Sequence, residues 1–150
     1  MLARRFSIAA ACALAGCAAP KLTVQSHAAA EGCSVSADGS AISCGGRAYA
    51  TLECTWAYGG CTRLALRYAD GDVARLYEAS GDPRLDTAAQ IMTAADGTRI
   101  WFLTLEGPQA ARRWREYDVS RGKLWDVGEG MAEAAAGRAA AIPLATQARR

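Results

Sequence analysis

The side chains that could carry acid–base chemistry are few in this chain of 150 residues. Histidine occurs once, at His27 in a polar N-terminal segment, so a buried Ser-His-Asp or Cys-His arrangement is not expected. The carboxylates Asp70, Asp72, Asp82 and Asp86 could form a hydrolytic pair, and an enzyme of that kind stays an alternative. Aspartate is favoured at turns, however. We therefore predict a non-enzymatic protein without catalytic residues.

Signatures of cofactors and metals are also missing. No glycine-rich loop precedes a helical segment in the way that cradles phosphates. Cysteines 33, 44, 54 and 61 are spaced too widely for the paired ligands, two to four residues apart, of a zinc site. The sequence therefore predicts neither a cofactor nor a metal centre.

Two clusters of side chains could instead form a binding surface for a partner. The first is Trp56 with Tyr58, between Cys54 and Cys61. If those cysteines are bonded, the short closed loop loses little entropy on binding. Tryptophan and tyrosine are also frequent among the residues that dominate binding energy. The alternative is that both rings fold onto the sheet as a small satellite core.

The second cluster is Arg113, Trp114 and Arg115. On a strand, Arg113 and Arg115 share one face and Trp114 lies on the other. Such a surface could dock anionic lipid headgroups or an acidic partner. The alternative is a solvated face on which arginine stems cover aromatic surface.

The first residues have the organisation of a secretory signal. Arg4 and Arg5 precede an apolar run over residues 6–15, about half of the roughly 20 residues that a membrane span needs. The run ends in Leu14-Ala15-Gly16-Cys17, which resembles the lipobox of bacterial lipoproteins. The resemblance implies that Cys17 is lipidated through its thiol and becomes the first residue of the mature protein.

Bacterial lipoproteins generally carry three acyl chains, and two or more chains anchor a protein stably to a bilayer. The resemblance therefore implies a protein of the cell envelope that is attached to the membrane. Ala18 after the lipidated cysteine favours the outer membrane, with the protein facing the periplasm. The alternative is a plainly cleaved signal, for which Ala28-Ala29-Ala30 offers a small-x-small site.

Maturation at Cys17 would divide the chain into four parts. These are a signal peptide (1–16), a lipidated tether (17–32), a disulfide-stapled β-domain (33–128) and an alanine-rich tail (129–150). Loss of Arg4 and Arg5 takes the formal net charge from +2 to zero. Binding of nucleic acid needs a basic face, so we predict the membrane and an envelope protein as partners, and no nucleic acid.

The four cysteines of an exported domain indicate disulfides, for which three connectivities are possible. Asp38-Gly39 is a strong hairpin signal, and the segment around it is symmetric. A two-residue turn there places Cys33 opposite Cys44, within disulfide reach. The preferred pairs are therefore Cys33–Cys44 and, by default, Cys54–Cys61.

Three Asp-Gly steps and one Ser-Arg-Gly step, at residues 120–122, separate segments of β-type composition. They predict strands near 33–37, 40–44, 47–54, 61–69, 72–78, 88–95, 98–105, 112–119 and 123–127. Short strands with regular turns indicate an all-β fold, an antiparallel meander that forms a small barrel or a sandwich. The tail after residue 128 is either a short helix or disordered.

The turns also predict registers. A two-residue turn at Asp70-Gly71 places Leu66 opposite Arg75, and one at Asp96-Gly97 places Ile91 opposite Phe102 and Met92 opposite Trp101. A three-residue turn at 120–122 places Tyr117 opposite Trp125.

These features favour a lipid-anchored envelope protein that binds a protein or envelope component through its β-domain. One alternative is a small β-barrel that carries an apolar ligand, which would need an interior cavity. Another is an inhibitor of a host hydrolase, because Leu66-Arg67-Tyr68-Ala69-Asp70-Gly71 is similar to a strand-turn segment of the lipoprotein inhibitors of C-type lysozyme.

Overall fold

The protein is described by a computed structural model that covers residues 32–146. The predicted signal peptide, the lipidation of Cys17 and almost all of the predicted tether lie outside these residues. Within them, no helix is long and apolar enough to cross a membrane.

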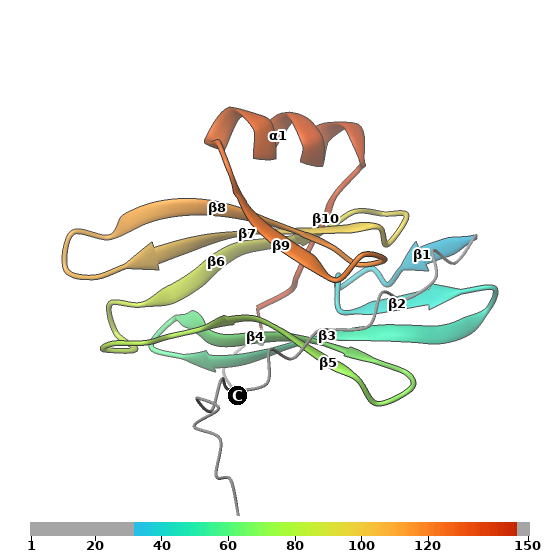
Figure 1. The fold of residues 1–150 in the computed structure, drawn as a ribbon, viewed down its shortest axis with the longest axis horizontal. Coiled ribbons are helices and arrows are strands. Elements are labelled where there is room, and N and C mark those ends of the chain that lie inside the picture. The colour runs from blue at the N-terminus through green and yellow to red at the C-terminus, as the bar shows by residue number, and fades with distance from the viewer. Residues whose placement is uncertain (1–31, 147–150) are drawn as a thin grey trace, which may run out of the picture.

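The described chain is mostly antiparallel β-structure with one helix (Figure 1), which confirms the predicted all-β class. The elements are β1 (Cys33–Val35), β2 (Ala41–Cys44), β3 (Arg47–Ala57), β4 (Gly60–Tyr68), β5 (Val73–Glu78), β6 (Thr87–Thr93), β7 (Arg99–Glu106), β8 (Ala111–Asp118), β9 (Lys123–Val127), α1 (Glu129–Arg138) and β10 (Ile142–Pro143). The nine predicted strands all form, because each Asp-Gly or glycine turn separates two segments that pair.

One sheet provides both layers of the fold (Figure 1). Its order is β1-β2-β3-β4-β6-β7-β8-β9, with β5 paired to β4 and β10 paired to β6. The strands β2 to β5 form one layer and β6 to β9 form the other (Figure 1). The sheet is not closed into a barrel, because β1 and β9 end the strand order without pairing to each other. Of the two predicted architectures, the structure therefore has the sandwich.

The two layers are joined where β4 divides between two neighbours. Most of β4 pairs with β5, whereas the beginning of β4 pairs with β6 through Cys61 and Ala88. Gly60 makes this approach possible, because a methyl group at that position would overlap the hydroxyl of Thr87. Thr87 Oγ1 lies 3.3 Å from the carbonyl oxygen of Cys61, at the same crossing. The lack of a side chain at residue 60 thus gives β4 and β6 room to meet.

Apolar side chains from both layers fill the space between them. Leu64 and Leu66 of β4 and Ile100 and Phe102 of β7 have no exposed surface. A buried pair of tyrosines crosses the core: the Tyr68 hydroxyl donates to the Val119 carbonyl at 2.7 Å and lies 3.0 Å from the Tyr117 hydroxyl. Since the single proton of Tyr68 is committed to Val119, Tyr117 donates to Tyr68. Burial raises the pKa of Tyr68, so both phenols stay protonated.

Both predicted disulfides are present, Cys33–Cys44 and Cys54–Cys61. Cys33 lies directly opposite Cys44 in the β1–β2 hairpin, as the symmetric turn predicts. The second bond closes the β3–β4 hairpin across an irregularity of register between Thr55 and Trp56.

The predicted pairs Leu66–Arg75 and Tyr117–Trp125 are wrong, each displaced by one residue. The β4–β5 turn has three residues, 69–71, rather than two, which places Leu66 opposite Ala74 rather than Arg75 and removes an arginine from the core side of the sheet. A bulge at Leu76 then restores the predicted pair of Leu64 and Tyr77. On β6, Met92 is opposite Trp101 as predicted, and a bulge of Gln90 (φ 49°) and Ile91 faces Phe102.

The second of these errors lies in the β8–β9 turn. Tyr117 is opposite Leu124, and Trp125 is opposite Glu116. The turn has four residues rather than three, because Asp118 pairs with Lys123 and its carboxylate accepts hydrogen bonds from the turn backbone. A slip of one residue moves a side chain to the other face of a sheet, so Trp125 shares a face with Glu116.

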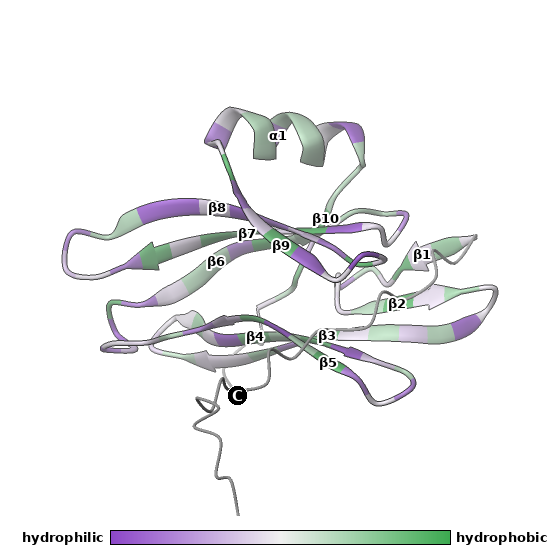
Figure 2. Cartoon of the chain, in the orientation of Figure 1, coloured by the Kyte–Doolittle hydropathy of each residue, from purple (hydrophilic) through white to green (hydrophobic). Residues whose placement is uncertain are grey.

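The predicted tail is partly helical and is packed on the sheet. Helix α1 covers the outer face of the β6–β9 layer, with apolar residues on both sides of the contact (Figures 1 and 2). Ala132 and Ala136 are buried against Trp101, Leu103 and Trp114. The helix passes through Gly137 and ends at Arg138. After it, β10 pairs with β6, and the Ala145 amide donates to the Asp38 carbonyl at 2.9 Å, so the chain returns to the first hairpin.

The crossing at Gly60 yields a test of the fold. We expect Gly60→Ala to lower the free energy of unfolding by about 1–3 kcal/mol, because the added methyl group separates β4 from β6. Gly128→Ala is the matched control, since nothing lies within 4 Å of a methyl group there. Chemical denaturation would measure both variants, and equal stabilities would contradict the role of Gly60.

Candidate functional site

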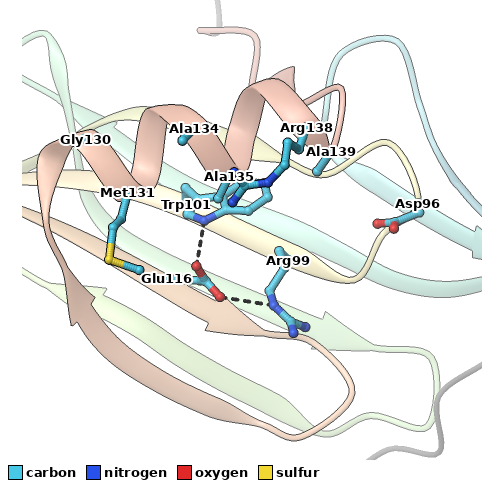
Figure 3. Close-up of a pocket in the computed structure, with 10 residues that line it drawn as sticks. All are labelled: Asp96, Arg99, Trp101, Glu116, Gly130, Met131, Ala134, Ala135, Arg138 and Ala139. Carbon is cyan, nitrogen blue, oxygen red and sulfur yellow. Dashed lines mark hydrogen bonds and ion pairs between the residues drawn. The ribbon is translucent and has the colours of Figure 1, made fainter.

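A groove of about 590 Å³ runs between α1 and the β7–β8 hairpin (Figure 3). Its floor is formed by Arg99 and Trp101 of β7 and Glu116 of β8, and its wall by Met131 and other residues of α1. Cavities of this size accommodate small ligands or a few side chains of a partner. The groove is therefore the candidate functional site.

The register of the β7–β8 hairpin positions the floor. Trp101 is opposite Glu116 and Arg99 is opposite Asp118, so all four side chains share the face that α1 covers. Opposite charges on directly opposed residues stabilise a hairpin. This register could have been predicted from the sequence, because Gly107-Pro108 marks the turn that fixes it. Arg99 and Trp101 were not among the predicted site residues.

Glu116 is held from two sides (Figure 3). The Trp101 indole nitrogen donates to its Oε2 at 2.9 Å, and Arg99 Nε donates to its Oε1 at 3.1 Å. The Glu116 side chain is 15% exposed. Both oxygens are thus occupied by fixed donors. The carboxylate is therefore part of a rigid floor.

Arg99 connects this floor to the β8–β9 turn. Its Nη1 lies 2.8 Å from Asp118 Oδ2, and the Asp118 side chain is 1% exposed. Asp118 Oδ1 accepts from the Ser120 and Arg121 amides at 3.1 and 2.9 Å. Burial alone would raise the pKa of Asp118, but these hydrogen bonds and the charge of Arg99 outweigh burial and lower it. Asp118 is therefore ionised near neutral pH.

The wall of the groove is more adaptable than its floor. Met131 is 69% exposed, and flexible methionine side chains adapt to many apolar partners. Arg138, from the last turn of α1, extends toward Trp101 (Figure 3). Arg138 has no ion pair within residues 32–146. The groove thus offers an apolar wall and a guanidinium group that can meet an acceptor.

The two residues of the first predicted cluster have different surroundings. Trp56 is half-buried and packs on the main core, as the satellite-core alternative expects. Tyr58 is 68% exposed at the tip of the β3–β4 hairpin, with a φ of 52°. Of these two aromatic side chains, only Tyr58 is therefore available for contact with a partner.

The three residues of the second cluster alternate along β8 as predicted. Trp114 is buried beneath α1 against Trp101, so it belongs to the support of the groove and not to an exposed surface. Arg113 is exposed. Arg115 points toward the other layer, with its Nη2 3.4 Å from Glu106 Oε1 and its Nε 3.3 Å from Asp126 Oδ1.

The carboxylates that were considered for hydrolysis have local partners. Asp70 accepts from the Asp72 amide at 3.0 Å, and Asp82 binds the side chain and amide of Arg84. Asp86 accepts the Gly107 amide at 2.8 Å. Residues 32–146 contain no group of three or more His, Cys, Asp or Glu side chains that could hold a metal ion.

No known protein family, curated protein or solved structure matches this chain.

The role of Asp118 yields a prediction with a defined pH dependence. Because its folded-state pKa is lowered, the stability that its charge contributes is present above the unfolded pKa of about 3.9 and is lost as the pH falls through the lower folded-state value. We expect Asp118→Asn to lower the free energy of unfolding by roughly 2 kcal/mol at pH 7. The difference from the parent should shrink below pH 4.

Denaturation at a series of pH values would measure this dependence. The control is Asp126→Asn, whose side chain is 61% exposed, with an expected cost below about 1 kcal/mol at every pH. A loss of stability in Asp118→Asn that is independent of pH would contradict the role given to the charge of Asp118.

Proposed function

We propose that this protein is a lipid-anchored, non-enzymatic binding module of the cell envelope, which holds a segment of a partner protein in the groove beneath α1. The observation that carries the proposal is the combination of a rigid floor and an adaptable wall. Glu116 is fixed by Trp101 and Arg99, whereas Met131 is exposed and Arg138 is unpaired within residues 32–146.

The chemistry of the groove indicates what kind of segment would fit. An apolar side chain of the partner would contact Met131 and the short alanine side chains of α1, such as Ala134. A carboxylate or a backbone carbonyl of the partner would accept from Arg138. Pre-organised polar groups lose little entropy on binding, so the fixed floor would favour affinity.

The engagement of the groove's carboxylates by neighbouring groups supports a binding role over catalysis, and Asp96 Oδ1, for example, accepts from the Thr98 amide and hydroxyl. A general base must reach a substrate proton with an available oxygen or nitrogen atom. Both oxygens of Glu116 already accept hydrogen bonds, and the Asp118 carboxylate is buried in the β8–β9 turn. The groove is therefore equipped to bind and to orient.

The packing of the core supports surface binding over carriage of an apolar ligand. An interior cavity would leave accessible surface on the side chains around it. Leu64, Leu66 and Phe102, at the centre of the two-layer core, have none.

The segment that is similar to the lysozyme inhibitors forms part of the framework. Leu66 and Tyr68 are buried in the core, and Arg67 binds Glu53 at 2.8 Å. These contacts give the segment a structural role, so the groove remains the basis of the proposal.

The anchor is tested by fractionating cells that express the parent and a Cys17→Ser variant. We expect the parent to remain with the membranes after a high-salt wash, because several acyl chains anchor it. The Cys17→Ser variant should appear in the soluble fraction or as unprocessed precursor. A parent that is washed off, or a variant that stays membrane-bound at its mature size, would contradict lipidation at Cys17.

The groove is tested by placing a photo-crosslinking amino acid at Met131 in cells. We expect a discrete adduct with one partner protein, because residue 131 lies on the wall of the groove. The matched control is the same crosslinker at Glu133, which is exposed on α1 and does not line the groove. Arg138→Glu should reduce the adduct at position 131 at least severalfold.

Equal adducts at positions 131 and 133, or an adduct that is unaffected by Arg138→Glu, would contradict binding in the groove. A partner captured only through a crosslinker at Tyr58 would move the binding site to the disulfide-closed hairpin.

A further inference from the structure

A second concave site lies between the two layers, away from the groove. It is a cleft of about 430 Å³ along the edge of β5, on the opposite face of β8 from α1. Its lower side includes Arg75, Tyr77 and Ser80, and its upper side is formed by Glu106 and Arg115. The groove described above shares none of these residues.

Two residues that line this cleft, Tyr77 and Arg115, each have a buried polar atom without a hydrogen-bond partner within residues 32–146, the Tyr77 hydroxyl and Arg115 Nε. Tyr77 is only 6% exposed, and its hydroxyl has no hydrogen-bond partner within residues 32–146. Buried hydroxyls are nearly always paired, because an unpaired one loses its hydration without compensation. An unpaired donor at this depth needs a partner from outside these residues, which is either ordered water or a bound ligand.

The bulge on β5 explains why this hydroxyl is buried. It turns both Leu76 and Tyr77 toward the core, whereas an unbroken strand would turn only one of them inward. Burial raises the pKa of Tyr77 to about 12, the nearby carboxylates of Asp86 and Glu106 act in the same direction, and Arg115 opposes them. The phenol is therefore protonated at neutral pH and can donate a hydrogen bond.

Two guanidinium groups also line the cleft: Arg115 from β8, and Arg75 from the edge of β5, where it lies opposite Ala65 and on the other face from Tyr77. Arg115 is held by two long contacts, 3.4 Å to Glu106 and 3.3 Å to Asp126, whereas strong charged hydrogen bonds measure about 2.7–2.9 Å. Arg75 has no ion pair within residues 32–146. The remaining charged group, Glu78, is engaged by Arg63 at 2.8 Å. Both arginines thus retain donors for a further acceptor.

We propose that this cleft binds a small ligand through a carboxylate or phosphate group, which accepts from the Tyr77 hydroxyl and from the guanidinium groups of Arg115 and Arg75. The ligand would take the place of the long contacts of Arg115 and would satisfy the only proton of the phenol. Arginine suits both anions, because its planar fork donates two parallel hydrogen bonds. This site is independent of the partner groove and does not rest on it.

Calorimetric titration of the purified protein with inorganic phosphate, and separately with succinate, tests the proposal. We expect saturable binding of at least one of them, and the comparison identifies the anionic group. Tyr77→Phe and Arg115→Gln should each weaken that binding about tenfold or more, because each removes a hydrogen bond to a charged group. Arg47→Gln is the control, since it removes the same charge from the exposed start of β3 and should bind as the parent does.

The thermal stability of Tyr77→Phe without ligand gives a second readout. If the hydroxyl is unpaired in the ligand-free protein, its removal should leave the melting temperature unchanged or higher, because an unpaired polar group is lost from the core. A hydroxyl that serves the fold, for example through an ordered water, would make Tyr77→Phe less stable, and that result would overturn the proposal. Failure of both anions to bind, or equal binding by the parent and Tyr77→Phe, would overturn it as well.

Discussion

The close contact of β4 with β6 is the constraint on which the rest of this structure depends. At that contact Cys61 pairs with Ala88, and Gly60 leaves room for Thr87. A flat sheet of the same strands would expose both of its faces. Folding the sheet at this point buries one face of each half in a common core and leaves the outer face of the β6–β9 layer for α1 (Figure 1). The groove and the cleft both exist because the sheet turns there.

Strand β8 serves both concave sites through the alternation of its side chains. Glu116 faces α1 and is fixed in the floor of the groove, whereas Arg115, the next residue, faces the opposite layer and lies over the cleft. Because successive side chains of a strand point to opposite faces, one strand can carry two sites that do not touch. The cluster of Arg113, Trp114 and Arg115 that stood out in the sequence is thus divided by the sheet and is not a single basic surface.

The polar network of the fold is concentrated where strands end. Asp118 closes the β8–β9 turn and binds Arg99, which in turn holds Glu116. Next to it, Tyr68 and Tyr117 connect the layers through the Val119 carbonyl. These groups are buried and satisfied, so they specify one arrangement of the hairpin. By contrast, three buried polar atoms have no hydrogen-bond partner within residues 32–146, and two of them, the Tyr77 hydroxyl and Arg115 Nε, belong to residues that line the cleft; the third is Trp114 Nε1.

The sequence by itself determined the hairpins and the disulfides. Asp38-Gly39, Asp70-Gly71 and Asp96-Gly97 each mark a turn between two segments that pair, and the symmetric hairpin places Cys33 against Cys44. Such signals are local, because a tight turn fixes which neighbouring residues meet. The lipobox at Cys17 is likewise a local pattern, and it stays a prediction because it lies outside residues 32–146. Tertiary structure alone decided the bulges at Leu76 and Gln90, the docking of α1 and the isolation of the Tyr77 hydroxyl. Those features depend on which layers meet across the core, and residues far apart in the chain settle that through packing rather than through any local pattern.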